Sequence, residues 1–241
     1  MDRRLWDQIE RVERRHWWFR GRRELVTSLL RSRLPDGARV LDIGCGTGFV
    51  LERLLEHFDA WGLEPDASVR ARASARAATR IRPGSTDDHS AVEHGSFDAL
   101  LLLDVLEHLD DDAKGLRATL PLLRPAGVVL VTVPAMPWLW SSHDVLNEHR
   151  RRYTRSALRR LAESAGLAPI LLSYANARLF PLALVHRAAL RTLGRRTDSE
   201  LEVPPGPVNE LFTRIFAGEA RGAKRGYPAG LSLVALLEPR Q

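Results

Sequence analysis

Short apolar runs alternate with segments of helical periodicity from about residue 35 to residue 175. Each apolar run is short enough for one buried strand, and the segment that follows it is long enough for a crossover helix. This alternation predicts an α/β fold built on a parallel sheet. The expected strands cover residues 39–43, 60–63, 80–82, 97–103, 128–133, 167–174 and, well separated from these, 231–237. The expected helices between them cover residues 48–58, 66–78, 110–123 and 155–165.

The segment before the first expected strand is helical in pattern. Leu5, Ile9, Val12 and His16 follow one another at spacings of four, three and four residues, and similar apolar spacings continue after them. These spacings place apolar side chains on one face of a helix. We therefore expect a helical segment over residues 5–34.

A second helical region lies before the last expected strand. Residues 178–193 predict an apolar helix, residues 197–207 a Pro-rich loop, and residues 208–216 an amphipathic helix. The expected organisation is therefore an N-terminal helical segment over residues 1–34 and an α/β domain over residues 35–241, with a helical lobe inserted at about residues 178–226.

The composition is that of a globular protein. Of the 241 residues, 44% are hydrophobic and 27% are charged, which argues against a disordered or fibrous chain. No apolar run reaches the roughly 18 residues that a membrane span needs, and the charged N-terminus lacks the apolar core of a secretory signal. The single cysteine, Cys45, excludes an intramolecular disulfide and a multi-cysteine metal site. We expect a cytoplasmic protein.

The net charge of +6 raises the question of an anionic partner. Almost all of the 36 basic residues are arginines, a composition that suits nucleic acids and anionic surfaces. However, the arginines are interleaved with acidic residues, and no Arg-rich tail is present. This pattern favours solvated arginine faces over a nucleic-acid-binding surface.

A glycine-rich turn follows the first expected strand, in the segment Asp42-Ile43-Gly44-Cys45-Gly46-Thr47-Gly48-Phe49. Glycines allow a tight turn and a close approach of the backbone to a ligand. Phe49 stands where a dinucleotide fingerprint requires its third glycine. Asp42 and Asp104 end two expected strands, where carboxylates would repel a pyrophosphate but attract an ammonium and a sulfonium. Glu64, 20 residues after Gly44, is placed to accept hydrogen bonds from a ribose diol. Together these features predict a site for S-adenosylmethionine.

At this point the chain resembles the class I S-adenosylmethionine-dependent methyltransferases, and within them the small bacterial branch with domains of types 11, 12 and 23. The likeness runs nearly from end to end. It is carried by the 42–48 loop and by the segments His16–Arg23, Ser96–Asp98, Asp104–Leu109, Arg124–Gly127, Val133–Ala135, Trp140–Asp144 and His149–Thr154.

The resemblance implies a Rossmann-like, doubly wound sheet of seven strands whose last strand is antiparallel. It also implies that the N-terminal segment is a lid. The implied cofactor contacts are Asp42, Gly44, Cys45, Gly46, Gly48 and Asp104 for the amino-acid part, Glu64 for the ribose, and Asp87 or the neighbouring Asp88 for the adenine.

The loop after the fifth expected strand carries the candidate chemistry. Methyl transfer requires alignment of the acceptor with the methyl group, and an amine or hydroxyl acceptor must also lose a proton. We expect His143 or His149 to be the general base and Asp144 to orient an imidazole. Arg151 and Arg152 are candidates for clamping an anionic acceptor. The alternative is that these side chains tie the loop to the sheet and pair with the acidic run 110–112.

Further residues are candidates for contact with the acceptor, namely Trp18, Arg22, His108 and Tyr153. The aromatic residues 17–19 among arginines suit either a lid that excludes water or a surface that stacks bases. Glu107 and His108 are adjacent and therefore do not face one way on a helix, so we expect no metal there.

The sequence thus predicts a methyltransferase that uses S-adenosylmethionine and acts on a small-molecule or lipid-linked acceptor. The acceptor atom can be oxygen, nitrogen or carbon. The apolar face of the 178–226 lobe, which includes Phe180, Leu184, Phe212 and Phe216, suits a hydrophobic acceptor or peripheral contact with a membrane surface. Two alternatives remain: an RNA methyltransferase or nucleic-acid-binding protein, and a non-catalytic interaction protein on the same fold.

Overall fold

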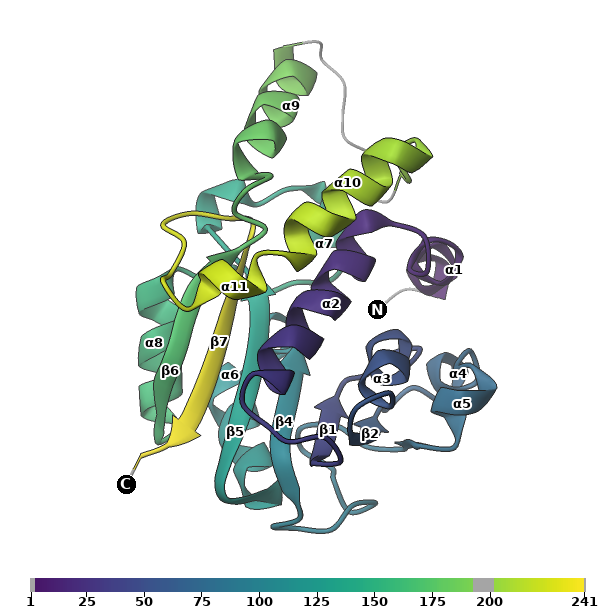
Figure 1. Cartoon of the computed structure of the whole chain (residues 1–241), viewed down its shortest axis with the longest axis vertical. Helices are drawn as coiled ribbons and strands as arrows, with labels where there is room; N and C mark the ends of the chain where they lie inside the picture. The colour runs from purple at the N-terminus through teal and green to yellow at the C-terminus, as the bar shows by residue number, and fades with distance from the viewer. Residues whose placement is uncertain (1–2, 193–201, 241) are drawn as a thin grey trace.

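A computed structural model describes residues 3–192 and 202–240 of the chain. Within these residues, seven strands form one sheet in the order β3-β2-β1-β4-β5-β7-β6 (Figure 1). The strands are β1 (Arg39–Ile43), β2 (Asp59–Leu63), β3 (Ile81–Arg82), β4 (Phe97–Leu103), β5 (Leu123–Pro134), β6 (Leu167–Ala175) and β7 (Ser232–Pro239). All neighbouring strands are parallel except at β7, which is antiparallel to both β5 and β6. This confirms the expected sheet with its antiparallel last strand.

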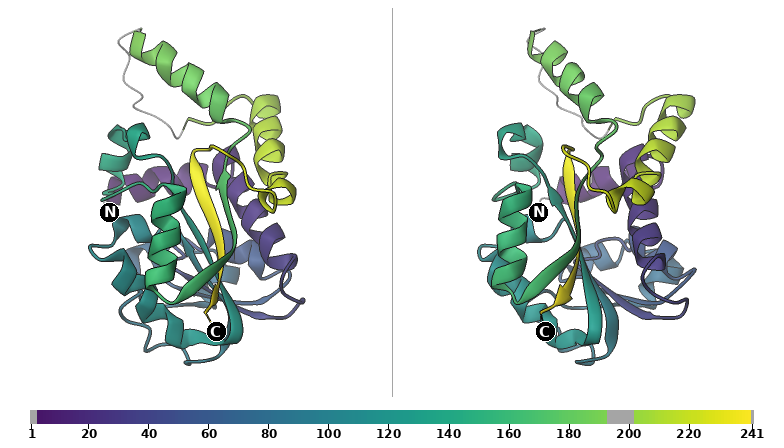
Figure 2. Two further views of the ribbon diagram at one scale, coloured as in Figure 1. Left: turned by 90° about the vertical axis from the view of Figure 1, so that its left-hand side faces the viewer. Right: turned by 60° about the vertical axis from the view of Figure 1, so that its left-hand side comes forward.

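Helices cover both faces of the sheet. Figure 2 shows α8 on one side of the strands and α2 with α10 on the other. The α-helices are α1 (Arg3–Val12), α2 (Trp17–Arg31), α3 (Phe49–Leu54), α4 (Ala67–Arg70), α5 (Ala75–Ala78), α6 (Asp112–Thr119), α7 (Ser142–Leu146), α8 (Arg155–Ser164), α9 (Phe180–Thr192), α10 (Gly206–Ala217) and α11 (Ala220–Ala223). Three 3₁₀ turns are η1 (Leu106–His108), η2 (Leu120–Leu122) and η3 (Pro137–Leu139).

Strand β4 shows how the sequence produces two cores. Its side chains alternate between the two faces of the sheet, and both faces are covered. Leu100 and Leu102 pack in the cluster that contains side chains of α6 and α8. Leu101 and Leu103 pack in the cluster that contains side chains of α2, α3 and α10. A strand that is covered on both faces has to be apolar at successive residues, and residues 99–103 of β4 are all apolar.

The N-terminal segment is helical, as expected for residues 5–34, but it forms two helices. Helix α1 ends at Val12, and α2 begins at Trp17. His16 caps the new helix, because its Nδ1 accepts a hydrogen bond from the Trp18 backbone N–H at 3.2 Å. The apolar spacing continues through the break, which is why the sequence pattern did not reveal it.

Three expected helices are shorter than their patterns, and the first of them, expected over residues 48–58, is α3 over Phe49–Leu54. The segment 66–78 contains α4 and α5, with Ser74 accepting from the Ala77 N–H at the start of the second helix. The segment 110–123 ends its α-helix at Thr119, and Pro121 lies in the 3₁₀ turn that follows. Proline has no N–H to donate and clashes with the preceding turn of an α-helix, so the helix stops before it.

The helical lobe packs on the N-terminal segment. Figure 1 shows α10 beside α2, while α9 projects beyond the sheet. The Asn209 side chain joins the two parts, since its Oδ1 accepts from the Trp17 N–H at 2.8 Å and its Nδ2 donates to the Arg15 carbonyl at 2.7 Å. Residues 193–201, which include part of the expected Pro-rich loop, lie outside the described residues.

The contact between α2 and α10 depends on a glycine. A Cβ atom on Gly21 would lie 2.7 Å from the Phe216 ring, and Phe216 is fully buried. We expect Gly21→Val to lower the free energy of unfolding by about 1–3 kcal/mol, because overpacking forces side chains and backbone apart. Urea unfolding would measure this loss. Gly206→Ala is the control, since nothing lies within 4 Å of a Cβ atom at that position. Equal stabilities of the two variants would contradict the packing.

Across the described ranges, none of the helices combines the length and the apolar character needed to cross a bilayer.

Candidate active site

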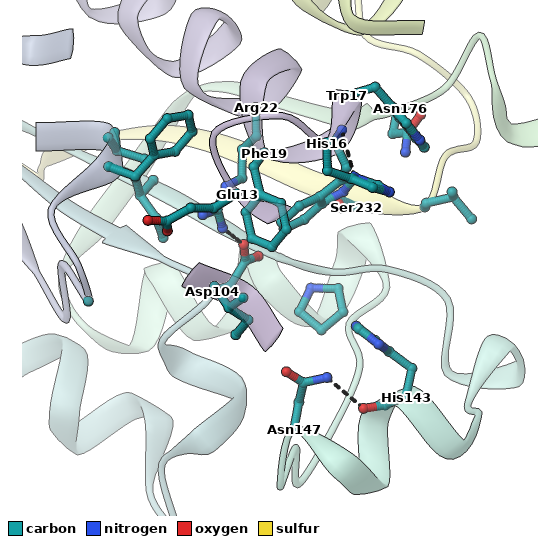
Figure 3. A pocket seen from close by; sticks show the side chains of 18 of the residues that line it. Glu13, His16, Trp17, Phe19, Arg22, Asp104, His143, Asn147, Asn176 and Ser232 are labelled. Carbon is teal, nitrogen blue, oxygen red and sulfur yellow. Dashed lines mark hydrogen bonds and ion pairs between the residues drawn. The ribbon is translucent and has the colours of Figure 1, made fainter. Parts of the chain in front are cut away.

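A cavity of about 850 Å³ opens at one edge of the sheet. Its floor comes from the carboxyl ends of β1 and β4, and side chains of α1, α2, α9 and α10 form much of its wall (Figure 3). In doubly wound α/β folds, ligands bind outside the carboxyl ends of the strands. The cavity has the position and the volume of a small-molecule site.

The glycine turn forms the cavity floor beyond β1. Gly44, Gly46 and Gly48 have φ angles of +75°, +57° and +78°, which favour glycine. The N–H groups of Gly44 and Cys45 both donate to the Leu63 carbonyl, at 2.8 and 3.0 Å. Residues 44–47 line the cavity, whereas Gly48 starts α3 behind it.

Two buried carboxyl groups flank this turn. Glu64 accepts hydrogen bonds from the backbone N–H groups of Gly46 and Asp66, both at 3.0 Å. Burial raises the pKa of Glu64, and these hydrogen bonds partly offset that effect. Asp42 is 2% exposed, and its Oδ1 has no hydrogen-bond partner in the described part of the chain. Burial raises the pKa of Asp42 to about 7. Asp42 is therefore a buried acid with an unused acceptor atom, and neither Asp42 nor Glu64 is among the residues that line the cavity.

The N-terminal segment covers the glycine turn. The Thr47 hydroxyl donates to the buried Glu13 carboxylate at 2.8 Å. The Trp6 ring lies close to Gly46, since a Cβ atom added to Gly46 would be 3.1 Å from that ring. Arg22 of α2 pairs with Asp104, which ends β4 with a φ of +57° (Figure 3). The Arg22 guanidinium also lies over the Trp18 ring, 4.6 Å from its centroid. The segment 3–31 thus forms a roof over the cofactor side of the cavity.

Asp144 organises the opposite side of the cavity. It is fully buried, and its carboxylate accepts from the Ser141 N–H at 2.8 Å in the capping box of α7. His149 bonds to it through Nδ1 at 3.0 Å, and Arg152 makes two hydrogen bonds to it, at 2.7 and 2.9 Å. Burial alone would raise the pKa of Asp144, but the bonds from His149 and Arg152 hold it well below its usual range. The structure therefore joins Asp144 to His149.

His149 brings a third side chain to the pair Glu107 and His108. Ligand atoms of these three residues all lie within 4.8 Å of one another. Glu107 is fully buried, and neither of its carboxylate oxygens has a hydrogen-bond partner among the described residues. Burial and the neighbouring Asp104 raise its pKa, while burial lowers the pKa of His108 to about 4. The sequence offered Glu107 and His108 but gave no sign of the third residue, 41 positions further along the chain.

Several candidate residues lie elsewhere. Arg151 donates to the carbonyls of Leu109 and Asp110, both at 2.9 Å, and pairs with Asp112 at 3.1 Å. The Tyr153 hydroxyl donates to Asp112 at 2.7 Å from a buried position. Neither residue lines the cavity, so both tie the loop to the acidic run, as the alternative interpretation expected. Arg152 lines the cavity, but Asp144 and the Ala135 carbonyl occupy its donors.

Asp87 is exposed on the loop after β3 and does not line the cavity. Trp18, Arg22, Asp104, His108, His143 and His149 do line it. These residues come from distant segments of the chain, and the structure places them around one cavity. Their roles stay predictions.

Asn176 is a cavity residue that the sequence analysis missed. It follows β6, has a φ of +51° and is fully buried (Figure 3). Neither its Oδ1 nor its Nδ2 has a hydrogen-bond partner in the described ranges. A buried amide without partners is costly, which points to a ligand group. A single asparagine after a strand carries no sequence signal that could have revealed this.

Comparison with known sequences places these features in context. A family profile described as "Methyltransferase domain" matches residues 14–172, more than half of the chain. The chain is 35% identical over 135 residues to the ubiquinone biosynthesis O-methyltransferase of Xanthomonas axonopodis pv. citri (strain 306), covering 54% of this chain and 55% of that one. It is 38% identical over 108 residues to the enzyme of the same name from Xanthomonas campestris pv. campestris (strain B100), covering 42% and 45%. The chain thus spans about half the length of the curated relatives it matches.

Solved structures share the fold. A SAM-dependent methyltransferase from Archaeoglobus fulgidus matches with a TM-score of 0.56 at 16% identity, covering 90% of this chain and 94% of that one. The phosphoethanolamine N-methyltransferase 2 of Haemonchus contortus, solved with S-adenosyl-L-methionine, matches with a TM-score of 0.59 at 18% identity, covering 90% and 52%. At these identities the likeness is one of architecture.

Proposed function

The chain belongs to the methyltransferase-domain family of class I S-adenosylmethionine-dependent enzymes, and we propose that it methylates a hydroxyl oxygen of a small-molecule or lipid-linked acceptor. One observation carries the proposal. A single cavity connects the glycine turn to the cluster of Glu107, His108 and His149. A cofactor on the turn and an acceptor at the cluster would therefore meet inside the same enclosed space, which is what transfer of a group between them requires.

The residues around the glycine turn fit S-adenosylmethionine. The turn keeps side chains away from the cavity floor, where residues 44–47 would hold the amino-acid part, with Gly48 fixing the turn behind them. Asp42 has an unused acceptor atom for a cationic group, and Glu64 ends the neighbouring strand, where it would bind the ribose. Bound there, S-adenosylmethionine supplies a methyl group on a positively charged sulfur, which makes that carbon an electrophile.

The roof over this part of the cavity would exclude water. The segment 3–31 contacts the turn through Trp6 and Glu13 and holds Asp104 through Arg22. A dry site strengthens the attraction between Asp104 or Asp42 and a cationic ligand. We therefore assign the N-terminal segment the role of a lid, as the resemblance implies.

The acceptor side combines apolar walls with few polar groups. Leu179 and Leu182 of the α9 region and Phe212 of α10 line it, with the unpaired Asn176 amide among them. Such a pocket suits a mostly apolar molecule that is oriented by a small number of hydrogen bonds. The similarity to relatives named for ubiquinone biosynthesis supports a hydroxyl acceptor with an apolar part.

Exposed apolar side chains stand near the same end of the molecule. Trp138 is 63% exposed, Val145 63% and Val185 67%, on η3, α7 and α9. We include contact of this surface with a lipid layer in the proposal, because it would present a lipid-linked acceptor to the cavity.

The acceptor hydroxyl has to lose its proton as it is methylated. Asp144 accepts from His149 Nδ1, so the lone pair of the neutral ring is on Nε2. The carboxylate of Asp144 thus fixes the ring of His149. We therefore place the acceptor hydroxyl beside His149, Glu107 and His108.

Calorimetric titration tests the cofactor assignment. We expect the purified protein to bind S-adenosylmethionine and S-adenosylhomocysteine but not NAD. Gly46→Arg should abolish binding of both adenosyl ligands, because it places a side chain against Trp6 at a position with a φ of +57°. Formation of S-adenosylhomocysteine with phenolic acceptors then tests turnover. Absence of adenosyl-ligand binding would favour the interaction-protein alternative, and salt-sensitive binding of RNA would favour the nucleic-acid alternative.

The affinity for S-adenosylhomocysteine should depend on pH through Asp42. Its pKa is raised to about 7, so the carboxyl is mostly neutral at pH 6 and mostly ionised at pH 8. Only the ionised form attracts the ligand ammonium, so the affinity should rise roughly tenfold over this range. Calorimetry at the two pH values measures the change. Asp42→Asn should remove it, while Asp87→Asn should keep it. A flat profile in the unmodified protein would contradict the role of Asp42.

A further inference from the structure

We propose that Glu107, His108 and His149 form a binding site for a divalent transition-metal ion at the acceptor end of the cavity. Their ligand atoms lie within 4.8 Å of one another, and all three residues line the cavity. Two imidazoles and one carboxylate are a common donor set for first-row metals such as Zn²⁺, Mn²⁺ and Fe²⁺. Ligands about 2.0–2.2 Å from one ion are themselves about 3–4 Å apart, so small side-chain rotations suffice to close the site.

The second observation is the state of Glu107. Its carboxylate is fully buried, and both oxygens are without hydrogen-bond partners in the described ranges. An ionised carboxylate in that position is strongly destabilised unless a cation or donors reach it. A protonated carboxyl would still need an acceptor for its O–H and donors for its carbonyl oxygen. A metal ion binds the ionised form and supplies the cation that this form lacks.

The nearest cations of the protein are already engaged. Arg22 pairs with Asp104, and Arg152 makes its two hydrogen bonds to Asp144. Asp104 also accepts from the Thr132 hydroxyl at 3.2 Å. Both arginines act on Glu107 through their charge, but neither donates a hydrogen bond to it among the described residues.

The surroundings of His149 match those of a ligating histidine. Its Nδ1 bonds to Asp144 at 3.0 Å, so the carboxylate fixes both the orientation of the ring and the proton on Nδ1. A carboxylate behind the imidazole is the usual support of a metal-bound histidine. Asp144 is held in turn by Arg152 and by the Ser141 N–H. Nε2 is consequently presented to the cluster as a lone pair.

Three protein ligands leave coordination positions open on the cavity side. Oxygen atoms of an acceptor would fill them, so this inference rests on the proposed function for the class of acceptor and adds a way to position it. A metal ion also lowers the pKa of a hydroxyl that it binds. In this arrangement His149 is a ligand in place of a general base, and the proton of the metal-bound hydroxyl leaves to solvent in the open part of the cavity. The acceptor is then a molecule that offers one or two oxygen atoms to a metal.

Cobalt binding tests the site directly. The full chain is stripped with a chelator and titrated with Co²⁺, whose visible absorption reports coordination by protein ligands, and Zn²⁺ is then used to displace it. We expect one equivalent to bind. Glu107→Gln and His149→Gln should each weaken binding at least tenfold, and His108→Gln serves if either variant fails to fold. Circular dichroism and urea unfolding establish that each variant is folded.

Matched controls lie outside the cavity. Glu93→Gln removes a carboxylate that is 78% exposed. His94→Ala breaks an exposed histidine pair whose ring nitrogens, on His89 and His94, are 3.1 Å apart and could themselves attract Co²⁺. Both controls should bind like the unmodified chain. Absence of binding, binding unaffected by the Glu107 and His149 variants, or binding lost in His94→Ala would each overturn the proposal.

The same experiment separates the inference from the proposed function. If the stripped protein binds S-adenosylmethionine and methylates an acceptor but binds no Co²⁺ at the cluster, the metal site is wrong and the proposed function stands. If Co²⁺ binds at the cluster while no adenosyl ligand binds, the metal site stands and the proposed function is wrong.

Discussion

Replacing Asp144 with asparagine is expected to lower the free energy of unfolding by about 3–5 kcal/mol. The substitution leaves Arg152, whose side chain is 5% exposed, without a charged partner in the interior. It also weakens the bond that fixes His149 and the capping box that starts α7. Few single substitutions on this protein should have a larger effect, because one carboxylate serves three elements of the site.

Urea unfolding of the two proteins measures the loss. Asp110→Asn is the matched control, since Asp110 pairs with Arg150 on the surface and is 85% exposed. Surface ion pairs contribute about 0–1 kcal/mol, so the control should be nearly as stable as the unmodified chain. A loss below about 1 kcal/mol for Asp144→Asn would show that Arg152 finds another partner or water.

The ion pair of Asp144 and Arg152 also predicts that the stability of the protein depends on pH. The pKa of Asp144 is held well below its usual range in the folded protein and returns to about 4 in the unfolded chain. The stabilisation is therefore fully present above pH 4 and is lost as the pH falls below that value. The Asp144→Asn variant should not show this loss of stability as the pH falls. Unfolding midpoints measured from pH 6 down to pH 3 compare the two proteins, and parallel profiles would contradict the assignment.

Replacing Glu64 with glutamine is expected to weaken S-adenosylmethionine binding by roughly 10- to 150-fold. The range follows from the loss of one hydrogen bond to a charged group, which is worth about 1.5–3 kcal/mol. The Glu64 carboxylate accepts hydrogen bonds from the backbone N–H groups of Gly46 and Asp66. In glutamine an NH₂ group, which is itself a donor, would face one of these two N–H groups. The turn is thus disturbed at the point where it meets the ligand.

Calorimetry with S-adenosylmethionine measures the change, with Glu93→Gln as the control for the same substitution on the surface. Competition with adenosine alone refines the result, because adenosine keeps the ribose but lacks the amino-acid part. Its affinity should fall by a similar factor. If adenosine binding is unchanged while S-adenosylmethionine binding falls, Glu64 acts on the turn and not on the ribose.

The sequence predicted the sheet well because buried strands must be apolar. The expected bounds of β1 and β4 match the structure, since both strands are covered on two faces. The break between α1 and α2 escaped prediction, because His16 and Glu13 are polar residues that are buried by contacts with distant parts of the chain. Nothing in the local pattern distinguishes a capping histidine from one within a helix.

The predicted cofactor residues around the glycine turn are close in sequence, and the structure places Glu64 against the turn through its hydrogen bond from the Gly46 N–H. Their role in binding a cofactor stays a prediction. Glu107, His149 and Asn176 are brought together by β4, β5 and β6, and their burial depends on the packing of the whole sheet. Arg151 and Tyr153 are residue types that can clamp a ligand, but in the structure both side chains bind Asp112.

The placement of β7 constrains the order in which the protein can assemble. Among the described strands, β6 pairs only with β7, which is itself inserted between β5 and β6. An isolated bridge also joins Tyr174 of β6 to Tyr227. During synthesis β6 is made first, so it has to wait, with its backbone groups unpaired, until the lobe and β7 have followed. The first five strands can form a sheet in the meantime, with β5 as a temporary open edge. Completion of the fold depends on contacts between residues far apart in the chain, and we expect that closing step to be slow and sensitive to aggregation.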